Sequence, residues 1–318
     1  MSINLAAARA ARAIVYRTLS PTPLLSHPLL DVKTGLTVFV KHENHNPTGA
    51  FKVRGGLNLI ANLGPAERRG VITATTGNHG QSIALACRSE GVPCTIVVPT
   101  GNNPDKNAAM RALGATLVEH GPDFDAAREH VEELCRTNGL RYVHSANEPH
   151  LITGVATYAL EIFEALPDAD VVLVPIGGGS GACGCALVRR WVGSKARVIG
   201  VQAAGADAFT RSWRSGTRVT CERVATFAEG MATRVTFDLT FEILRNELDD
   251  VVTLSEEELE GGVRLALETT HNLAEGAGAA ALAAAFKLRG QLQGKKVVCV
   301  MSGGNIDGAT LGRIMNRH

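Results

Sequence analysis

The stretch from Asn46 to Gly55 carries the side chain best suited to covalent chemistry, Lys52. It reads Asn-Pro-Thr-Gly-Ala-Phe-Lys-Val-Arg-Gly, so the lysine follows a Pro-Thr-Gly-Ala turn and stands next to Phe51. A lysine in a glycine-rich, partly desolvated turn loses its proton more readily, and its amine can then form a Schiff base with an aldehyde. A solvated lysine without a catalytic role is the ordinary alternative. The residues of this stretch alone leave both interpretations open.

Three other glycine-bearing turns each follow a predicted strand and open a predicted helix: residues 75–80, 177–181 and 302–305. Ligands of open α/β sheets gather at the carboxyl ends of the strands, where such turns lie. The second turn consists of Gly177, Gly178, Gly179, Ser180 and Gly181. Four glycines let the main chain turn its N–H groups inward, and the following helix adds its positive end. We therefore predict a phosphate site there, with a ligand-free turn as the alternative.

The same turn also fits a dinucleotide-binding fingerprint, with Gly177, Gly179 and Ala182 at the G-x-G-x-x-A positions. A nicotinamide-dependent oxidoreductase is thus a rival hypothesis. That fingerprint requires an acidic residue roughly 20 residues further on, which binds the ribose hydroxyls. Gln202 stands near that position. The missing acid argues against the oxidoreductase.

Short β-branched runs alternate with helical patterns through most of the chain. The predicted strands are 71–74, 95–98, 115–118, 171–174, 198–201 and 297–300, and predicted helices include 79–89, one from 104, and 124–137. Continuous apolar strands are typical of parallel sheets covered on both faces. The predicted fold class is α/β.

Two helix starts carry specific signals. At the N-terminus, Ala6, Ala10 and Ile14 recur at helical spacing before Pro21, which favours a surface helix over a transit peptide. Ser255 with Glu258 forms a predicted capping box, so the acidic run beginning at Glu256 needs no functional explanation.

Composition excludes several classes of protein. At about 150 residues per domain, the 318 residues indicate two domains. A net charge of +1 excludes the basic footprint of a dedicated nucleic-acid binder. No apolar run reaches the ~18 residues of a membrane span, so no membrane association is expected. The seven cysteines lack a repeated C-x-x-C frame, which indicates a reducing compartment, and we expect a soluble cytoplasmic protein.

The order of these motifs resembles that of the fold-type II pyridoxal-phosphate enzymes, specifically the threonine/serine dehydratase and serine racemase group. The match runs from Thr22-Pro23-Leu24 to Ser302-Gly303-Gly304-Asn305, nearly the whole chain. The resemblance implies two open twisted sheets with helices on both faces. It implies a small domain, residues 68–149, inserted in a large one formed by residues 1–67 and 150–318. It also implies a homodimer.

The resemblance assigns cofactor roles to the motifs. Lys52 would form the Schiff base with pyridoxal 5'-phosphate and remove the substrate α-proton, while Phe51 would pack on the cofactor ring. Asn78 would hydrogen-bond the ring oxygen, and Ser302 would meet the pyridine nitrogen. The turn of Gly177, Gly178, Gly179, Ser180 and Gly181 would bind the cofactor phosphate.

The resemblance also implies a substrate site. Thr75, Gly77, Asn78 and His79 would bind the substrate carboxylate, in agreement with the position of this turn before a helix. Thr76 would lie on the face of the cofactor opposite the lysine. The implied reaction is that of an ammonia-lyase, in which a 3-hydroxy amino acid such as threonine or serine becomes a 2-oxo acid and ammonia.

Departures from the family pattern leave other substrates and reactions open. Residues 144–147 and 154–157 differ from the usual His-Pro and Gly-Gln-Gly-Thr segments, so a hydroxyaspartate, a phenylserine or a hydroxyectoine-derived substrate is an alternative. Serine racemases place a serine where Thr76 stands, which disfavours racemisation. β-Replacement enzymes usually continue Lys-Asp-Arg, whereas Lys52 is followed by Val53. A third alternative is a binding protein on an inactive enzyme scaffold. Such a protein would be expected to have lost Lys52 or Ser302, and both are present.

No metal site is expected. Relatives that bind a divalent cation use two carboxylates, and the matching positions here are Gln202 and Ala208. Without those hard ligands, Mg²⁺ or Ca²⁺ binding should be weak. Because the chain ends soon after the Ser302 motif, we also expect no appended effector domain.

Overall fold

The computed structural model describes residues 2–316, which form two sheets and thirteen α-helices. The strands are β1 (Leu24–Ser26), β2 (Thr37–His42), β3 (Val71–Ala74), β4 (Cys94–Val98), β5 (Thr116–Glu119), β6 (Arg141–Tyr142), β7 (Val171–Pro175), β8 (Arg197–Ala203), β9 (Asp250–Leu254) and β10 (Lys296–Met301). All six predicted strands are present, with ends that differ by at most two residues.

The helices occupy the remaining periodic segments. They are α1 (Leu5–Val15), α2 (Pro28–Thr34), α3 (Lys52–Ala61), α4 (Asn78–Glu90), α5 (Pro104–Ala112), α6 (Phe124–Asn138), α7 (Pro149–Ala165), α8 (Ser180–Trp191), α9 (Ala208–Ser215), α10 (Asp238–Glu247), α11 (Glu256–Thr270), α12 (Gly276–Lys287) and α13 (Gly308–Met315). The predicted helices 79–89, from 104 and 124–137 correspond to α4, α5 and α6, and the two predicted helix starts correspond to α1 and α11.

One sheet has six strands in the order β1-β2-β10-β7-β8-β9. Strand β1 runs antiparallel to β2, and the other four pairings are parallel. The other sheet has four parallel strands in the order β5-β4-β3-β6. These sheets confirm the predicted α/β class, and the antiparallel edge strand is the one departure from all-parallel sheets.

The chain divides into two compact units. Unit 1 comprises residues 1–19 and 52–154, and unit 2 comprises residues 20–51 and 155–318. Unit 1 therefore takes in more chain than segment 68–149, which the sequence predicts as the small domain. The predicted domain limits remain a prediction.

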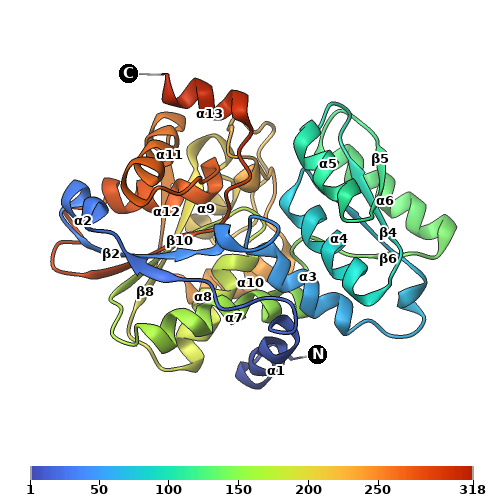
Figure 1. The fold of residues 1–318 in the computed structure, drawn as a ribbon, viewed down its shortest axis with the longest axis horizontal. Helices are drawn as coiled ribbons and strands as arrows, with labels where there is room; N and C mark the ends of the chain where they lie inside the picture. Colours follow the sequence, from blue (N-terminus) through green and yellow to red (C-terminus); the bar gives the residue numbers. More distant parts are fainter. Residues whose placement is uncertain (1, 317–318) are drawn as a thin grey trace. The chain divides into compact units, whose positions relative to one another are not determined.

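Within each unit, helices cover both faces of the sheet. In unit 1, α4 and α5 lie on one face and α6 on the other (Figure 1). In unit 2, α11 and α12 lie on one face, and α8 and α10 on the other (Figure 1). Helix α12 is almost entirely apolar because it is buried between the sheet and α11. Each turn that follows a central strand is thereby fixed at the edge of a packed sheet.

Both helix starts that carry specific signals in the sequence are present in the structure. The capping box is confirmed, since Ser255 Oγ accepts from Glu258 N and Glu258 Oε2 accepts from Ser255 N. The helix expected near the N-terminus is present as α1, which buries Ala8, Ala11 and Val15 and leaves Ala10 exposed. Among residues 2–316, no helix combines the length and apolar character needed to cross a bilayer.

Candidate active site

The loop of residues 46–51, which precedes Lys52, is called the lysine loop. A buried hydrogen-bond network in unit 2 fixes its start. Lys41 Nζ donates to Glu161 Oε2 at 2.5 Å and to the Thr22 carbonyl oxygen at 2.6 Å. Thr22 Oγ1 donates to Glu43 Oε1 at 2.5 Å, and Asn46 Nδ2 donates to Glu43 Oε2 at 2.9 Å. Buried charged groups require such partners, and here the partners join three separate segments. The network therefore holds the main chain in place where the lysine loop follows strand β2.

The same loop pairs with the Ser302 motif. Phe51 N donates to the Ser302 carbonyl oxygen at 3.0 Å, and Gly304 N donates to the Gly49 carbonyl oxygen at 2.8 Å. Asn305 Nδ2 adds a bond of 2.8 Å to the Thr48 carbonyl oxygen. Two motifs that lie about 250 residues apart in sequence are thus joined through their main chains. The pairing fixes Phe51, the residue before Lys52, beside the carboxyl end of β10.

Ser302 lies directly after β10 and is nearly buried, with 7% of its surface exposed. Its hydroxyl donates to the Ala277 carbonyl oxygen at 3.4 Å. A serine hydroxyl has two acceptor lone pairs and rotates to suit its partner. Its position is therefore compatible with the predicted contact to a ring nitrogen.

The glycine turn after β7 has no space for side chains at its start. A Cβ atom on Gly177 would lie 2.0 Å from the carbonyl oxygen of Gly230, and Gly179 adopts a φ of +92° as the N-cap of α8. Ser180, the first residue of α8, is 1% exposed. The turn therefore presents main-chain groups at a helix N-terminus, which is the arrangement that binds phosphate. These residues fit a phosphorylated cofactor.

Two side chains from other helices hold this turn. Thr240 Oγ1, on α10, donates to the Gly178 carbonyl oxygen at 2.8 Å. The hydroxyl of Tyr158, on α7, donates to the Gly181 carbonyl oxygen at 2.8 Å. The ring of Phe51 lies beside the same glycine and meets the Tyr158 ring edge-on, with centroids 6.0 Å apart. Sequence reasoning missed both Thr240 and Tyr158.

In unit 1, Lys52 is the first residue of α3 and is partly buried. Ser82 Oγ, on α4, donates to its carbonyl oxygen at 2.6 Å, and its own Nζ donates to the Ser145 carbonyl oxygen at 3.4 Å. Burial lowers the pKa of its ammonium from 10.5 to about 8. An amine with this pKa is partly neutral near physiological pH, as a nucleophile or general base must be.

The turn between β3 and α4 contains the predicted carboxylate site. Thr75 is buried, and its Oγ1 accepts from Gly77 N at 3.0 Å and from Gly80 N at 3.3 Å. Thr76 and Asn78 are both partly exposed, and Asn78 is the first residue of α4. Thr75 therefore shapes the turn with its side chain, and the helix N-terminus follows directly.

His79 is placed differently from an anion-binding side chain. Its ring is buried, and Nε2 lies 3.1 Å from Thr73 Oγ1. Burial, and then the charges of Lys52 and His144, lower the pKa of the ring to about 3. The imidazole is therefore neutral at physiological pH, so a carboxylate at this turn would meet the main-chain N–H of His79 without a cationic ring.

Lys106, on α5, covers the same turn and was not predicted. Its side chain is 8% exposed, and a Cβ on Gly77 would lie 2.5 Å from Lys106 Cδ. Met110, one turn later on α5, lies in the same way against Gly80. The turn thus depends on glycines because α5 packs directly on it.

Gln202 and Ala208 stand at the positions where metal-binding relatives would have carboxylates. In this structure the side chain of Gln202 has a structural role. Gln202 Oε1 accepts from Thr210 N at 2.9 Å and from Thr210 Oγ1 at 2.8 Å. Gln202 and Ala208 are both fully buried. Within residues 2–316 no cluster of three His, Cys, Asp or Glu side chains suits a metal. The absence of a divalent cation stays a prediction.

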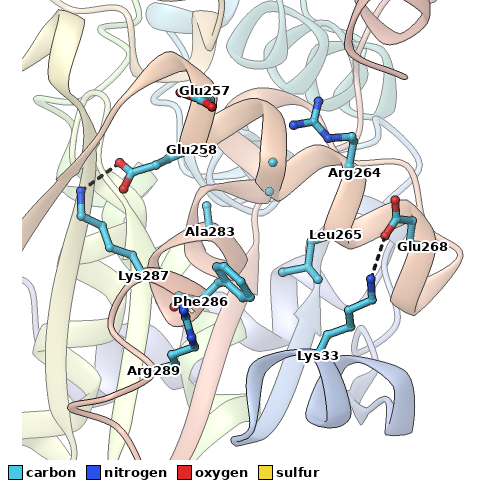
Figure 2. A pocket seen from close by; sticks show the side chains of 12 residues that line it. Lys33, Glu257, Glu258, Arg264, Leu265, Glu268, Ala283, Phe286, Lys287 and Arg289 are labelled. Carbon is cyan, nitrogen blue, oxygen red and sulfur yellow. Dashed lines mark hydrogen bonds and ion pairs between the residues drawn. The ribbon is translucent and has the colours of Figure 1, made fainter. Parts of the chain in front are cut away.

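A groove of about 570 Å³ between α11 and α12 lies apart from these motifs (Figure 2). Phe286 points into it, and its rim carries the ion pairs Lys287–Glu258 at 2.9 Å and Lys33–Glu268 at 3.6 Å. None of the predicted site residues lines this groove.

The unexpected interactions share one property: each joins a site motif, or the segment that leads to it, to a separate segment of the chain. Tyr158 and Thr240 hold the phosphate turn, Lys106 covers the carboxylate turn, and the Lys41–Glu161 pair fixes the lysine loop. The only signal available for Tyr158 was the rarity of aromatic residues, of which tyrosine contributes three.

Comparison with known proteins identifies related chains. Residues 15–303 match the model of the family described as pyridoxal-phosphate dependent enzyme. An L-threonine ammonia-lyase of Thermotoga maritima is 39% identical over 98% of this chain and 77% of its own length. An L-threo-3-hydroxyaspartate ammonia-lyase of a Pseudomonas species is 35% identical over 90% of each chain.

A solved structure has the same fold. The processed form of threonine deaminase isoform 2 from Solanum lycopersicum superposes with a TM-score of 0.92 at 32% identity, over 98% of this chain and 91% of that one. The family match covers most of the chain, and the glycine turn and Lys52 have the properties that the family's cofactor requires. The chain belongs to the family of pyridoxal-phosphate-dependent enzymes, and pyridoxal 5'-phosphate is its cofactor.

Proposed function

We propose that the protein is an ammonia-lyase that eliminates water from a 3-hydroxy amino acid and yields a 2-oxo acid and ammonia. The observation that carries this proposal is Lys52, a partly buried amine whose pKa is lowered to about 8. It is located in the same unit as the turn of residues 75–79. The names of the similar proteins, threonine ammonia-lyase and hydroxyaspartate ammonia-lyase, support the same reaction class.

Each cofactor-binding motif has a proposed task. The N–H groups of residues 177–181 bind the cofactor phosphate, and Ser302 meets the ring nitrogen. Phe51 packs beside the ring, and Asn78 binds the ring oxygen. When bound, the cofactor withdraws electrons from the substrate α-carbon. The residues of the chain then need only bind, orient and move protons.

The proposed proton transfers involve few residues. The neutral amine of Lys52 removes the α-proton, and the β-hydroxyl leaves as water after protonation, so that the proton taken up by Lys52 and the one given to the hydroxyl cancel over the cycle. The released enamine takes up water and loses ammonia, which balances the reaction. The turn formed by Thr75, Gly77, Asn78 and His79 binds the substrate carboxylate through the start of α4. Thr76 lies on the opposite face of the reacting carbon from Lys52.

Two substrate classes are candidates. Threonine or serine is favoured by the more similar relative, and a 3-hydroxyaspartate by the second one. The loop of residues 144–147 is the candidate specificity segment, because Ser145 contributes the carbonyl oxygen that Lys52 Nζ contacts. His144 Nδ1 accepts from Ala146 N and Asn147 N, each at 3.0 Å, so its proton is on Nε2.

A substrate panel tests the proposed reaction. Purified protein is incubated with L- and D-threonine, serine, 3-hydroxyaspartate and phenylserine, and 2-oxo acid and ammonia are measured together. Equimolar formation of both products from at least one member is expected. Formation of neither from any member contradicts the ammonia-lyase. Release of the opposite enantiomer without ammonia would favour a racemase, for which Thr76→Ser is the informative variant.

A separate experiment tests the role of Lys52. The protein should absorb visible light, and borohydride reduction should attach the cofactor to Lys52, as shown by peptide mass spectrometry. Lys33, an exposed lysine, is the matched control and should remain unmodified. A colourless protein, or attachment at another lysine, contradicts the assignment.

We further propose that the protein is a cytoplasmic homodimer. Leu29 and Val32, on α2, are 54% and 82% exposed, and Phe286 is 41% exposed in the groove of Figure 2. The groove's rim carries both signs of charge, which two copies related by a twofold axis can pair. Light scattering should give twice the mass of one chain, and Val32→Glu should give the mass of one. A monomeric wild type contradicts the proposal.

A further inference from the structure

Tyr158 connects three parts of unit 2. The residue is fully buried on α7, and its hydroxyl donates to the Gly181 carbonyl oxygen at 2.8 Å. The same hydroxyl accepts a bond from Cys185 Sγ, on α8, at 3.3 Å. Both capacities of the hydroxyl, to donate and to accept, are therefore used by the helix that begins with the glycine turn.

The glycine turn, Phe51 and Tyr158 meet at one point. A Cβ on Gly181 would lie 3.3 Å from the Tyr158 hydroxyl and 3.4 Å from two carbons of the Phe51 ring. The rings of Phe51 and Tyr158 contact edge to face, at an angle of 79°. Phe51 is itself bonded to Ser302 through its main chain. Tyr158 therefore touches the turn and the lysine loop at once.

We propose that Tyr158 is a positioning residue for the phosphate turn. By bonding to the Gly181 carbonyl oxygen it keeps the first turn of α8 aligned, so that the N–H groups of residues 177–181 already point at the phosphate position before the cofactor binds. Preorganisation of this kind raises affinity because less order must be gained on binding. The inference rests on the proposed function of this turn as the phosphate site.

A purely structural role makes a different prediction. If Tyr158 only fills space, its loss lowers the stability of the cofactor-free and the cofactor-bound protein equally, and cofactor affinity does not change. If it positions the turn, its loss leaves the Gly181 carbonyl without this partner in the aligned state, and the binding-competent conformation becomes less populated. The dissociation constant of the cofactor separates the two.

The test is Tyr158→Phe, which removes one oxygen atom and keeps the ring beside Phe51. We expect the dissociation constant of pyridoxal 5'-phosphate to rise on the order of tenfold, from the cost of a lost buried hydrogen bond. The dissociation constant of inorganic phosphate from the cofactor-free protein, measured by calorimetry, should rise by the same factor. Tyr142→Phe makes the same chemical change in unit 1 and should change neither constant.

Two results would overturn the inference. Unchanged binding of both ligands by Tyr158→Phe would reduce Tyr158 to a packing role. Weaker binding of pyridoxal 5'-phosphate with unchanged binding of phosphate would place its effect away from the turn. If Tyr158→Phe does not fold, Tyr158→Met, with a flexible apolar side chain, replaces it under the same criteria. If wild-type protein does not bind the cofactor, the proposed function itself fails, which is a distinct result.

Discussion

Phe51 N donates a 3.0 Å hydrogen bond to the carbonyl oxygen of Ser302, and this bond joins the loop before the candidate catalytic lysine to the turn after the last strand. Ala50 and Gly303 form a β-bridge beside it. The loop is thereby paired with the segment after β10 through one isolated antiparallel bridge, outside the named strands. Main-chain bonds hold this end of the loop, and the side chain of Asn305 adds a bond to the Thr48 carbonyl oxygen.

The first prediction concerns Gly49 in this loop. Gly49 has a φ of +67°, and an added Cβ would lie 2.5 Å from Asn305 Oδ1, whose amide is bonded to the Thr48 carbonyl. Gly35 has a φ of +69° with nothing within 4 Å of an added Cβ. In both variants an alanine must adopt the left-handed conformation, which lowers the free energy of unfolding by roughly 1–2 kcal/mol. Gly49→Ala should lose about 1–3 kcal/mol more because of the overlap.

Chemical denaturation of the two variants measures this difference directly. Gly35→Ala is the matched control, since it isolates the conformational cost. Equal losses in the two variants would show that Asn305 can move away without cost, and that the pairing of the loop with the Ser302 motif is loose.

The second prediction concerns the pH dependence of cofactor attachment. Only the neutral amine of Lys52 attacks an aldehyde, and its pKa is lowered to about 8 by burial. The neutral fraction rises about fivefold from pH 7 to pH 8 and less than about twofold from pH 8 to pH 9. The rate at which cofactor-free protein gains visible absorbance should follow this curve and level off above pH 9.

A small amine that represents an exposed lysine is the reference for this experiment. Its rate of attachment should rise about tenfold per pH unit across the whole interval, because its pKa is 10.5. A protein curve parallel to that reference would mean that Lys52 is solvated, and the proposed role of burial would be wrong.

The third prediction concerns the stability cost of Lys52. In the unfolded chain its pKa is near 10.5, and in the folded chain it is about 8, so the unfolded state binds more protons between these values. The contribution of Lys52 to the stability of the cofactor-free protein therefore rises with pH from 8 to 10.5, and below pH 8 its full cost is present. Lys52→Met should stabilise the cofactor-free protein at pH 7 by as much as ~3 kcal/mol.

The difference in free energy of unfolding between Lys52→Met and wild type should shrink as the pH rises toward 10.5. Urea denaturation at pH 7, 9 and 10 measures this difference, and Lys195→Met, at an exposed lysine outside the groove, is the control for the effect of a lysine-to-methionine change on the surface. A difference that stays constant with pH would assign the stabilisation to the methionine's apolar surface instead of to the lost charge.

The elements that the sequence predicts well are those whose signal is local. Strand β3 begins and ends where predicted because its four residues are buried on both faces and apolar or β-branched. Strands β2 and β9 were missed because each contains charged residues, including the buried Lys41. Lys41 is accommodated through the Thr22 carbonyl oxygen and through Glu161 on α7, a partner 120 residues away that no local pattern can indicate.

The same distinction applies to the candidate site. Lys52, Ser302 and the glycine turns were found because their residue types and order are distinctive within short segments. The ring of His79, by contrast, lies against Thr73, so its burial and low pKa depend on packing within unit 1. Tyr158 and Thr240 were missed for the same reason, because a hydrogen bond to a distant carbonyl leaves no trace in the local sequence.

The fourth prediction concerns the pair Gly77 and Lys106. Gly77→Ala should place a methyl group 2.5 Å from the position of Lys106 Cδ, so the lysine must move away from the turn. The expected results are a loss of stability of about 1–3 kcal/mol and a rise in the KM for the amino acid substrate on the order of tenfold. Lys106→Ala removes the side chain that the new methyl group would meet. In the double variant the two losses should therefore be less than additive, with a coupling of about 0.5–3 kcal/mol.

A second pair provides the control for this cycle. Gly261 has nothing within 4 Å of an added Cβ, so Gly261→Ala combined with Lys106→Ala should be additive. Strict additivity in the Gly77 cycle as well would mean that Lys106 does not depend on the glycine. In that case the main chain of the turn would have to explain why residue 77 lacks a side chain. Coupling in KM as well as in stability would show that the cover provided by α5 affects the site to which the substrate carboxylate is assigned.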